Sequence, residues 1–421
     1  MWKITLCLPL LLTAFLPVYC EKNIPLDLIQ NEQNASAQKL QHWYKHQCWR
    51  AIENYYQAHK TQMTPEESNA SLPIIALSYS AQGNQTAAEA LANAFINNNK
   101  SASPHQLNIM HGILLKSFIE HNDWTAAEPH YRTLLKTDNV SSLPLWIRYT
   151  LADTALQQND PSRTLTLLTS SYASTDQNNP LRPRMAFLLA IANMRLKNPE
   201  QAHAYFTECY EHPEAGTLAG LAAKGRVQAT NDRLKSVSDE KKPHVERQLL
   251  TDLQALLDDH TSLTEVEKSN ALRQQAQLLS QMLRHDEANE RLNQILHMSS
   301  SPQERAQIYL QIAFNSYLAR KDANSFHYNA QQALRTDPAL ASLKSLRLAL
   351  FHIYEKLSDE NPQWTLPAAE QLAAAYPSLN SKMASPHLTS ARNLSTKLYQ
   401  PLSSSTSSQL GLLLLPPPRY R

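Results

Sequence analysis

The stretch Leu114–Asp138, LLKSFIEHNDWTAAEPHYRTLLKTD, decides the fold of this chain. Its first half has the apolar pattern of a helix, and Asp123 stands where an N-cap would begin a second helix. The apolar residues that follow lie on one face of that second helix, at i, i+4, i+7 and i+8: Ala127, Tyr131, Leu134 and Leu135. One pair of helices cannot bury this face by itself, so the pattern predicts neighbouring copies stacked on it.

The composition of the chain favours an all-α fold. Only 6 of the 421 residues are glycine, too few for the turns of most α/β or β-rich enzymes, whereas good helix formers such as Ala, Leu and Gln are abundant. The 39 basic and 37 acidic residues are interspersed and give a net charge of +2, so a nucleic-acid partner is disfavoured. Cys48 and Cys209 are expected to be buried, unpaired thiols.

Similar two-helix stretches recur along the sequence. If each is aligned on a small residue of its second helix, the first four copies place Ala88, Ala127, Thr164 and Ala202 at intervals of 39, 37 and 38 residues. The pattern of small and aromatic residues resembles that of the tetratricopeptide repeat (TPR), whose unit has about 34 residues. Asn329–Pro338, NAQQALRTDP, is similar to the end of that unit. The resemblance implies an all-α, helix-turn-helix solenoid with a right-handed superhelix.

The sequence suggests four regions along the chain. Residues 1–20 resemble a signal peptide, 21–62 are predicted to cap the array with one long helix at Ser36–Lys60, and 63–378 form the repeat array. Residues 379–421, rich in Ser and Pro, are predicted to be a flexible tail. Between the fourth copy and Ala276 the period slips, which leaves open either an elongated turn within the stack or a hinge between two half-arrays.

The N-terminal region predicts export. Lys3 precedes an apolar run of about 15 residues, and a polar stretch begins at Glu21, whereas a spanning helix needs about 20 residues. We therefore expect a bacterial protein of the periplasm or cell envelope. Cleavage after Cys20 is favoured because Tyr19 is a poor fit to the small residue expected before a lipidated cysteine. Lipidation of Cys20 is the alternative, and only then would the protein associate with a membrane.

Motifs that would carry catalysis are incomplete. Gly220–Val227 has the glycine spacing of a phosphate-binding loop, but an Arg-Val pair replaces the required Lys and Ser or Thr, and close helix packing explains Gly216 and its neighbours better. His42 and His46 are spaced as two zinc ligands on a helix, but Trp43 stands in place of the general-base Glu. We predict solvent-facing histidines and a non-enzymatic protein without metal or cofactor.

The resemblance also places a binding surface, because the first helices of TPR units line a concave groove and their outward positions select the ligand. Carried over to this sequence, the candidate binding residues are Lys116, Trp146, Tyr149, Asp153, Arg184, Phe187, Met194, Gln311 and Asn315. Aromatic residues and Arg dominate binding energies at interfaces. Packing between helices explains Trp146 and Phe187 equally well.

These observations predict a protein-interaction scaffold of the cell envelope that offers a groove to a protein or peptide partner, in assembly or secretion. One alternative is a polysaccharide-binding or export component that uses the same groove. Another is a lipid-anchored structural subunit, which the state of Cys20 would reveal. The sequence does not indicate the oligomeric state.

Overall fold

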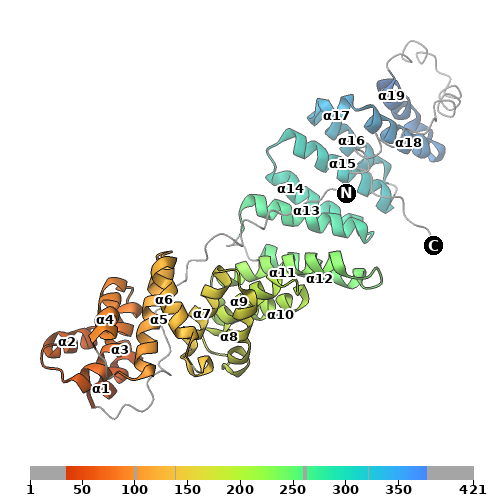
Figure 1. Cartoon of the computed structure of the whole chain (residues 1–421). Coiled ribbons are helices and arrows are strands. Elements are labelled where there is room, and N and C mark those ends of the chain that lie inside the picture. The colour runs from red at the N-terminus through yellow and green to blue at the C-terminus, as the bar shows by residue number, and fades with distance from the viewer. Residues whose placement is uncertain (1–34, 99–101, 138, 259–262, 321, 377–421) are drawn as a thin grey trace. The chain divides into compact units, whose positions relative to one another are not determined.

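The computed structural model describes residues 35–98, 102–137, 139–258, 263–320 and 322–376 (Figure 1). Every regular element within these ranges is a helix, and the described residues contain no strand. The predicted signal segment, 1–20, and the predicted tail, 379–421, lie outside them. The chain divides into two compact units between Asp252 and Leu253. We call them the N-terminal unit and the C-terminal unit.

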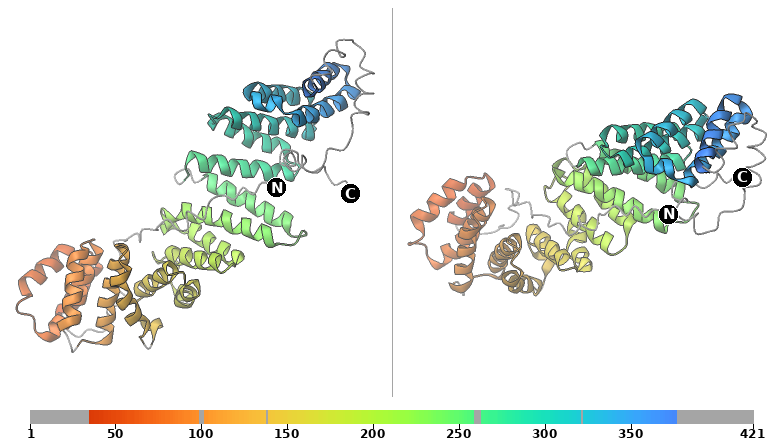
Figure 2. Two further views of the ribbon diagram at one scale, coloured as in Figure 1. Left: turned by 45° about the horizontal axis from the view of Figure 1, so that its top comes forward. Right: turned by 90° about the horizontal axis from the view of Figure 1, so that it is seen from above.

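The N-terminal unit is a series of helix pairs, each made of a first and a second helix joined by a turn (Figures 1 and 2). Each first helix also contacts the first helix of the next pair, so the pairs stack as the repeat pattern predicts. The pairs are α3(Pro65–Ala81) with α4(Gln85–Asn98), α5(Pro104–Glu120) with α6(Trp124–Leu135), α7(Leu145–Gln157) with α8(Pro161–Ser174), α9(Arg182–Arg195) with α10(Pro199–Glu211), and α11(Leu218–Ser236) with α12(Lys242–Asp258).

The same turn recurs inside the first four of these pairs and once in the C-terminal unit. Between α5 and α6, Asn122 is left-handed (φ 58°), its N–H donates to the Ile119 carbonyl at 3.0 Å, and the Asp123 N–H donates to the Phe118 carbonyl at 2.8 Å. These two bonds define a Schellman motif, which satisfies the last carbonyls of the first helix. Equivalent left-handed residues with the same bonds are Gly83, Asn159, Lys197 and Leu283. From Gly83 to Lys197 they are 39, 37 and 38 residues apart, which confirms the predicted spacing.

Side-chain caps start many of the helices. The carboxylate of Asp123 accepts a hydrogen bond from the Ala126 N–H at 3.0 Å, as predicted, so the second helix begins directly after the turn. The sequence also predicts capping boxes at Thr64, Ser103 and Asn198, each followed by Pro at the first helical position. The first two are confirmed. The third is wrong, because the Asn198 side chain makes no capping bond.

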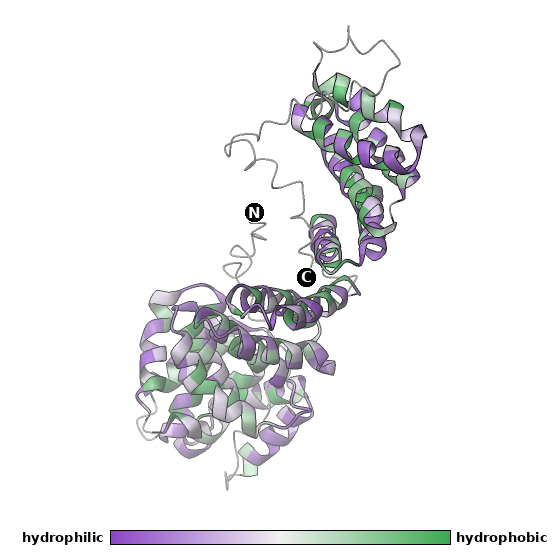
Figure 3. Ribbon diagram, turned by 90° about the vertical axis from the view of Figure 1, so that its right-hand side faces the viewer, coloured by the Kyte–Doolittle hydropathy of each residue, from purple (hydrophilic) through white to green (hydrophobic). Residues whose placement is uncertain are grey.

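The small residues of the second helices allow the two helices of a pair to approach closely. Ala88, Ala127, Thr164 and Ala202 are all fully buried, and the Thr164 hydroxyl donates to the Ala152 carbonyl at 2.9 Å, so even this polar member leaves no unpaired group. Hydrophobic and hydrophilic residues are interspersed along the helices (Figure 3). The buried ones join into one core cluster that runs from α1 to α11.

The C-terminal unit continues the same plan. Its pairs are α13(Glu265–Gln281) with α14(His285–Met298), α15(Pro302–Arg320) with α16(Ala323–Thr336), and α18(Lys344–Glu360) with α19(Thr365–Ala375), and α17(Pro338–Ser342) connects the last two. Aromatic rings fill its core, where Tyr354 contacts both Phe326 and Trp364 at centroid distances of 5.0 and 6.2 Å. Across the described part of the chain, no helix combines the length and hydrophobicity that crossing a bilayer requires.

The capping region differs from the prediction. The single helix expected at Ser36–Lys60 is instead a pair, α1(Ala35–Lys45) and α2(Trp49–His59). Gln47 is left-handed (φ 56°), and the Cys48 N–H donates to the Trp43 carbonyl at 2.8 Å. This is again a Schellman turn. The amphipathic pattern runs through it, and neither Gly, Asn nor Pro marks it, so the break is invisible to periodicity.

Glycines and cysteines also show where the predictions fail. A Cβ on Gly225 would lie 2.5 Å from the Phe206 ring, so this glycine does serve close packing. Gly216 instead lies in a turn (φ 53°) with nothing within 4 Å of its Cβ position, and the packing prediction for it is wrong. Cys209 is buried and free as expected, whereas Cys48 is free but exposed, because it lies in the turn that splits the capping region.

Candidate functional site

The candidate binding residues come from first helices. α3, α5, α7, α9 and α11 form a continuous layer, since each contacts the next. Seven of the candidates lie on α5, α7 and α9 of this layer, and the other two lie on α15 of the C-terminal unit. The structure therefore places the candidates on the element type that the resemblance implies. Their exposure differs widely.

The two aromatic candidates that could equally be packing residues are buried. Trp146 and Phe187 are only 5% and 7% exposed. Trp146 lies against Gly112 of α5, where a Cβ would come within 2.8 Å of the indole. The Phe187 ring meets the ring of Phe206 on α10 edge-on, with 5.7 Å between centroids. Both side chains fill space between helices, and a binding role for them remains a prediction.

Two ionisable candidates, Lys116 and Asp153, are also buried. The Lys116 ammonium pairs with the Glu120 carboxylate at 3.0 Å, and Glu120 also accepts from the Gln85 side chain at 2.9 Å. The Asp153 carboxylate has one side-chain bond, from Gln157 at 3.2 Å. Burial raises the pKa of Asp153 to about 6, against the smaller opposing effect of Gln157. Asp153 is therefore a costly group in its present environment.

The remaining candidates are more accessible, with one exception. Tyr149, Arg184 and Met194 are partly buried, and Gln311 is exposed. Asn315 is only 3% exposed, and its side-chain oxygen accepts from the Ser280 hydroxyl at 3.0 Å. On the first-helix layer of the N-terminal unit, Tyr149, Arg184 and Met194 thus offer the accessible surface among the candidates.

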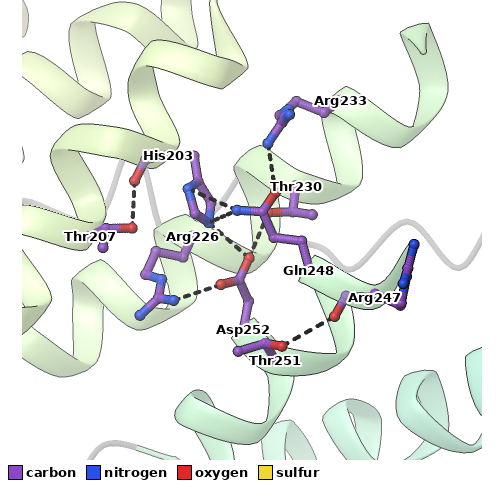
Figure 4. Close-up of polar contacts among 9 residues, drawn as sticks. All are labelled: His203, Thr207, Arg226, Thr230, Arg233, Arg247, Gln248, Thr251 and Asp252. Carbon is purple, nitrogen blue, oxygen red and sulfur yellow. Dashed lines mark hydrogen bonds and ion pairs between the residues drawn. The ribbon is translucent and has the colours of Figure 1, made fainter. Parts of the chain in front are cut away.

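A buried polar cluster in the N-terminal unit was not predicted (Figure 4). Asp252 of α12 is 1% exposed and accepts hydrogen bonds from side chains of two other helices. Arg226 Nη2 donates to Oδ1 at 2.8 Å, and the Thr230 hydroxyl donates to Oδ2 at 2.6 Å. His203 Nε2 of α10 donates to Oδ2 at 2.9 Å. One carboxylate thus connects α10, α11 and α12.

The cluster is organised to keep this carboxylate ionised. Burial raises the pKa of Asp252, but the hydrogen bonds from His203 and Thr230 and the charges of His203 and Arg226 outweigh it, and the net pKa is lowered. The Arg226 guanidinium also lies 5.1 Å from the centroid of the Tyr210 ring, and Gln248 approaches His203 at 3.3 Å. With its oxygens bonded, Asp252 is arranged to hold helices together rather than to take up a proton.

The sequence did contain a signal for this cluster. Arg226 shares a helical face with Ala222, Ala223 and Ala229. Asp252 shares one with Leu249, Ala255 and Leu256. A single charge on an apolar face must be paired when it is buried, so two such charges of opposite sign on consecutive helices could have been matched. His203 carries no comparable signal, because its neighbours in α10 are mixed.

Metal ligation finds no support among the described residues, where no three His, Cys, Asp or Glu side chains are arranged to hold an ion. His42 of α1 and His46, in the turn that follows this helix, are exposed, as predicted. The stretch with the glycine spacing of a phosphate-binding loop is part of α11, so its backbone N–H groups belong to a helix and do not form an anion cradle.

Comparisons with known proteins add little. No family model matches the chain, and no curated protein matches its sequence. Among solved structures it is similar to "TPR2AB-domain:pHSP90-complex of yeast Sti1", with 12% sequence identity and a TM-score of 0.24, over 71% of this chain and 96% of that chain. The description of this protein as an all-α, TPR-like helical-repeat solenoid rests on its own helix pairs and recurring turns.

Proposed function

We propose that the protein is a non-enzymatic scaffold for protein interactions, and that an extended segment of a protein partner lies along the first helices of the N-terminal unit. The continuous layer of first helices supports this proposal. Such a layer spreads binding over many small contacts without any catalytic group. Tyr149, Arg184 and Met194 are partly accessible there, and Tyr, Arg and Met are residue types enriched at interfaces.

The proposed setting is the bacterial cell envelope, in assembly or secretion. The signal-like sequence of Met1–Cys20 supports export. Intact-mass measurement of protein from the producing cell tests this part separately. A mature chain that begins at Glu21 would support plain cleavage, and an acylated Cys20 would support the lipid-anchored alternative. A chain that still begins at Met1 would contradict export.

Site-specific photo-crosslinking tests the scaffold itself. A photoreactive residue at Tyr149 or Arg184 reports on first helices of the N-terminal unit, whereas one at Thr166 of α8 or Ala204 of α10, both exposed, reports on its second helices. We expect the two first-helix positions to cross-link one protein partner in living cells and the two control positions to cross-link it much less. Equal cross-linking at all four positions would contradict the proposed surface.

A separate binding measurement on arrays of peptides and glycans tests the alternative ligand. Selective retention of glycans over peptides would favour a polysaccharide ligand.

A further inference from the structure

Two histidines face each other inside the second helix pair. His111 of α5 and His130 of α6 have their Nδ1 atoms 2.8 Å apart and their ring centroids 5.1 Å apart. Phe118 stacks on the His130 ring, with 5.8 Å between centroids and 19° between planes. Both imidazoles are partly buried, and neither is among the candidate binding residues.

The distance fixes the protonation state of the pair. Two ring nitrogens at 2.8 Å form a hydrogen bond only if one carries a hydrogen and the other presents a lone pair. If both rings were imidazolium ions, two N–H donors and two positive charges would meet at this distance. The contact therefore requires at least one neutral imidazole.

Charged groups on the neighbouring helices are already engaged. On α5 and α6 the pairs are Lys116 with Glu120 at 3.0 Å and Arg132 with Glu128 at 2.6 Å. The engaged groups of α3, α4 and α7 are Glu67 with Thr64, Glu89 with Ser117, Arg148 with Ser171, and Asp153 with Gln157. The remaining acidic residue of α3, Glu66, lies exposed in its first turn.

The electrostatic environment penalises a second proton. Burial lowers the pKa of both histidines, and the charge of His130 lowers the pKa of His111 further, to about 4. No carboxylate contributes to either pKa shift. A histidine whose pKa in the folded state lies below its ordinary value of 6.5 destabilises the fold increasingly as the pH falls below 6.5. The reason is that the unfolded chain then binds the proton more readily than the folded protein does.

We propose that His111 and His130 form an acid-sensitive clasp that holds α5 against α6, and that protonation of the pair loosens the second repeat. The clasp lies between two helices of one pair, so its opening would expose the apolar face that this pair buries. The N-terminal unit would then be a pH-responsive array. The inference does not depend on the proposed function.

Thermal unfolding of the full chain at about pH 7.5 and about pH 5 tests the clasp. The variants are His111→Gln and His130→Gln, because Gln keeps hydrogen-bonding capacity but cannot become charged. We expect the melting temperature of the unaltered protein to fall by several degrees more in acid than that of either variant. The matched control is His244→Gln, at an exposed histidine of α12, which should leave the acid-induced fall unchanged.

Two measurements on the unaltered protein guard against variants that fail to fold. Amide hydrogen exchange, corrected for intrinsic rates, should rise about tenfold at acidic pH in peptides from α5 and α6, more than in peptides from α9. Nitrogen-15 spectra should show His111 and His130 titrating as a coupled pair. Independent titration of both rings near their ordinary pKa, or parallel melting profiles for the unaltered protein and both variants, would overturn the proposal. EDTA in all samples prevents metal ions from bridging the rings.

Discussion

Leu283 is the least favourable residue at the recurring turn. The position needs a positive φ, and Gly83, Asn122 and Asn159 suit it, whereas Leu283 holds φ 62° with its side chain 73% exposed. A branched residue in the left-handed region costs about 1–2 kcal/mol. Burial does not compensate, because the side chain lies in solvent.

Replacing Leu283 should therefore stabilise the protein. We expect Leu283→Asn to raise the free energy of unfolding by about 1 kcal/mol, because Asn tolerates the left-handed conformation and leaves both backbone hydrogen bonds of the turn in place. Urea unfolding followed by circular dichroism measures the change. The reverse substitution at an equivalent turn, Asn159→Leu, serves as the comparison and should destabilise by a similar amount. A neutral or destabilising Leu283→Asn would contradict the account.

Asp153 gives a pH-dependent prediction. Its pKa is raised by burial from 3.8 to about 6, so the ionised form destabilises the fold, and this penalty grows as the pH rises from 3.8 through 6. We expect Asp153→Asn to stabilise the protein by about 2–3 kcal/mol at neutral pH and by little at about pH 4. Denaturant unfolding at the two pH values measures this. Asp359→Asn, at an exposed position of α18, should show no such difference.

Several helix caps could be predicted from the sequence because a cap acts locally. Asp123 needs only its own helix start to function as a cap, and the structure confirms it. The environment of Asp153 was not readable, since its burial depends on helices far away in sequence. The same holds for Trp146, which sits against Gly112 of the preceding pair.

At the scale of elements, the helix pairs could be predicted because their pattern repeats. Features that occur once could not be predicted in this way. The recurring small residues located the second helices of the first four pairs because a close helix contact needs them. The break between α1 and α2 depends on Gln47 adopting a left-handed conformation, for which Gln is not a signal. The polar cluster at Asp252 was missed because its partners are up to 49 positions apart.

The Asp252 cluster should dominate the stability of the contact among α10, α11 and α12. We expect Asp252→Ala to cost about 3–5 kcal/mol, because it leaves Arg226 buried without its partner. The double substitution Asp252→Leu with Arg226→Met should cost much less. Urea unfolding of the two variants distinguishes these outcomes, and equal losses would show that the charge pair is not the cause.

The same cluster has a pH signature of opposite sign to that of Asp153. The pKa of Asp252 lies below its ordinary value of 3.8, so its stabilising effect is complete above that value and is lost as the pH falls through the folded-state pKa. Between about pH 5 and pH 8 the difference between the unaltered protein and Asp252→Leu/Arg226→Met should therefore be constant. A difference that already shrinks near pH 6 would assign the effect to His203 instead.

At the scale of the whole molecule, the sequence left open whether the slip in period after the fourth copy is an elongated turn within the stack or a hinge between two half-arrays. The slip in period after the fourth copy does include an elongated turn, at residues 237–241, between α11 and α12. These two helices are joined by Asp252 with Arg226 and by Gln248 with Arg233, so they form a fifth pair. The division between the units falls within α12. Periodicity could not locate it, because a continuous helix carries the chain across it.

The two cysteines of the described chain should report on the integrity of the N-terminal unit. Cys209 of α10 is fully buried, and burial raises the pKa of its thiol to about 12, whereas Cys48 is exposed. Thiolate formation and access both control alkylation. At neutral pH a maleimide should therefore modify Cys48 at once and Cys209 only after this unit opens, as read by mass spectrometry of the two peptides.

Denaturant and a variant make this labelling a quantitative measure of opening. Modification of Cys209 should rise with urea along the same curve as unfolding of the N-terminal unit, and Asp252→Ala should shift that curve to lower urea. Cys48→Ser provides the control, since it removes the fast phase and should leave the slow phase unchanged. If Cys209 reacted in native buffer as fast as Cys48, the stacked helix pairs would not form a closed core around α10, and the proposed continuity of the repeat array would fail there.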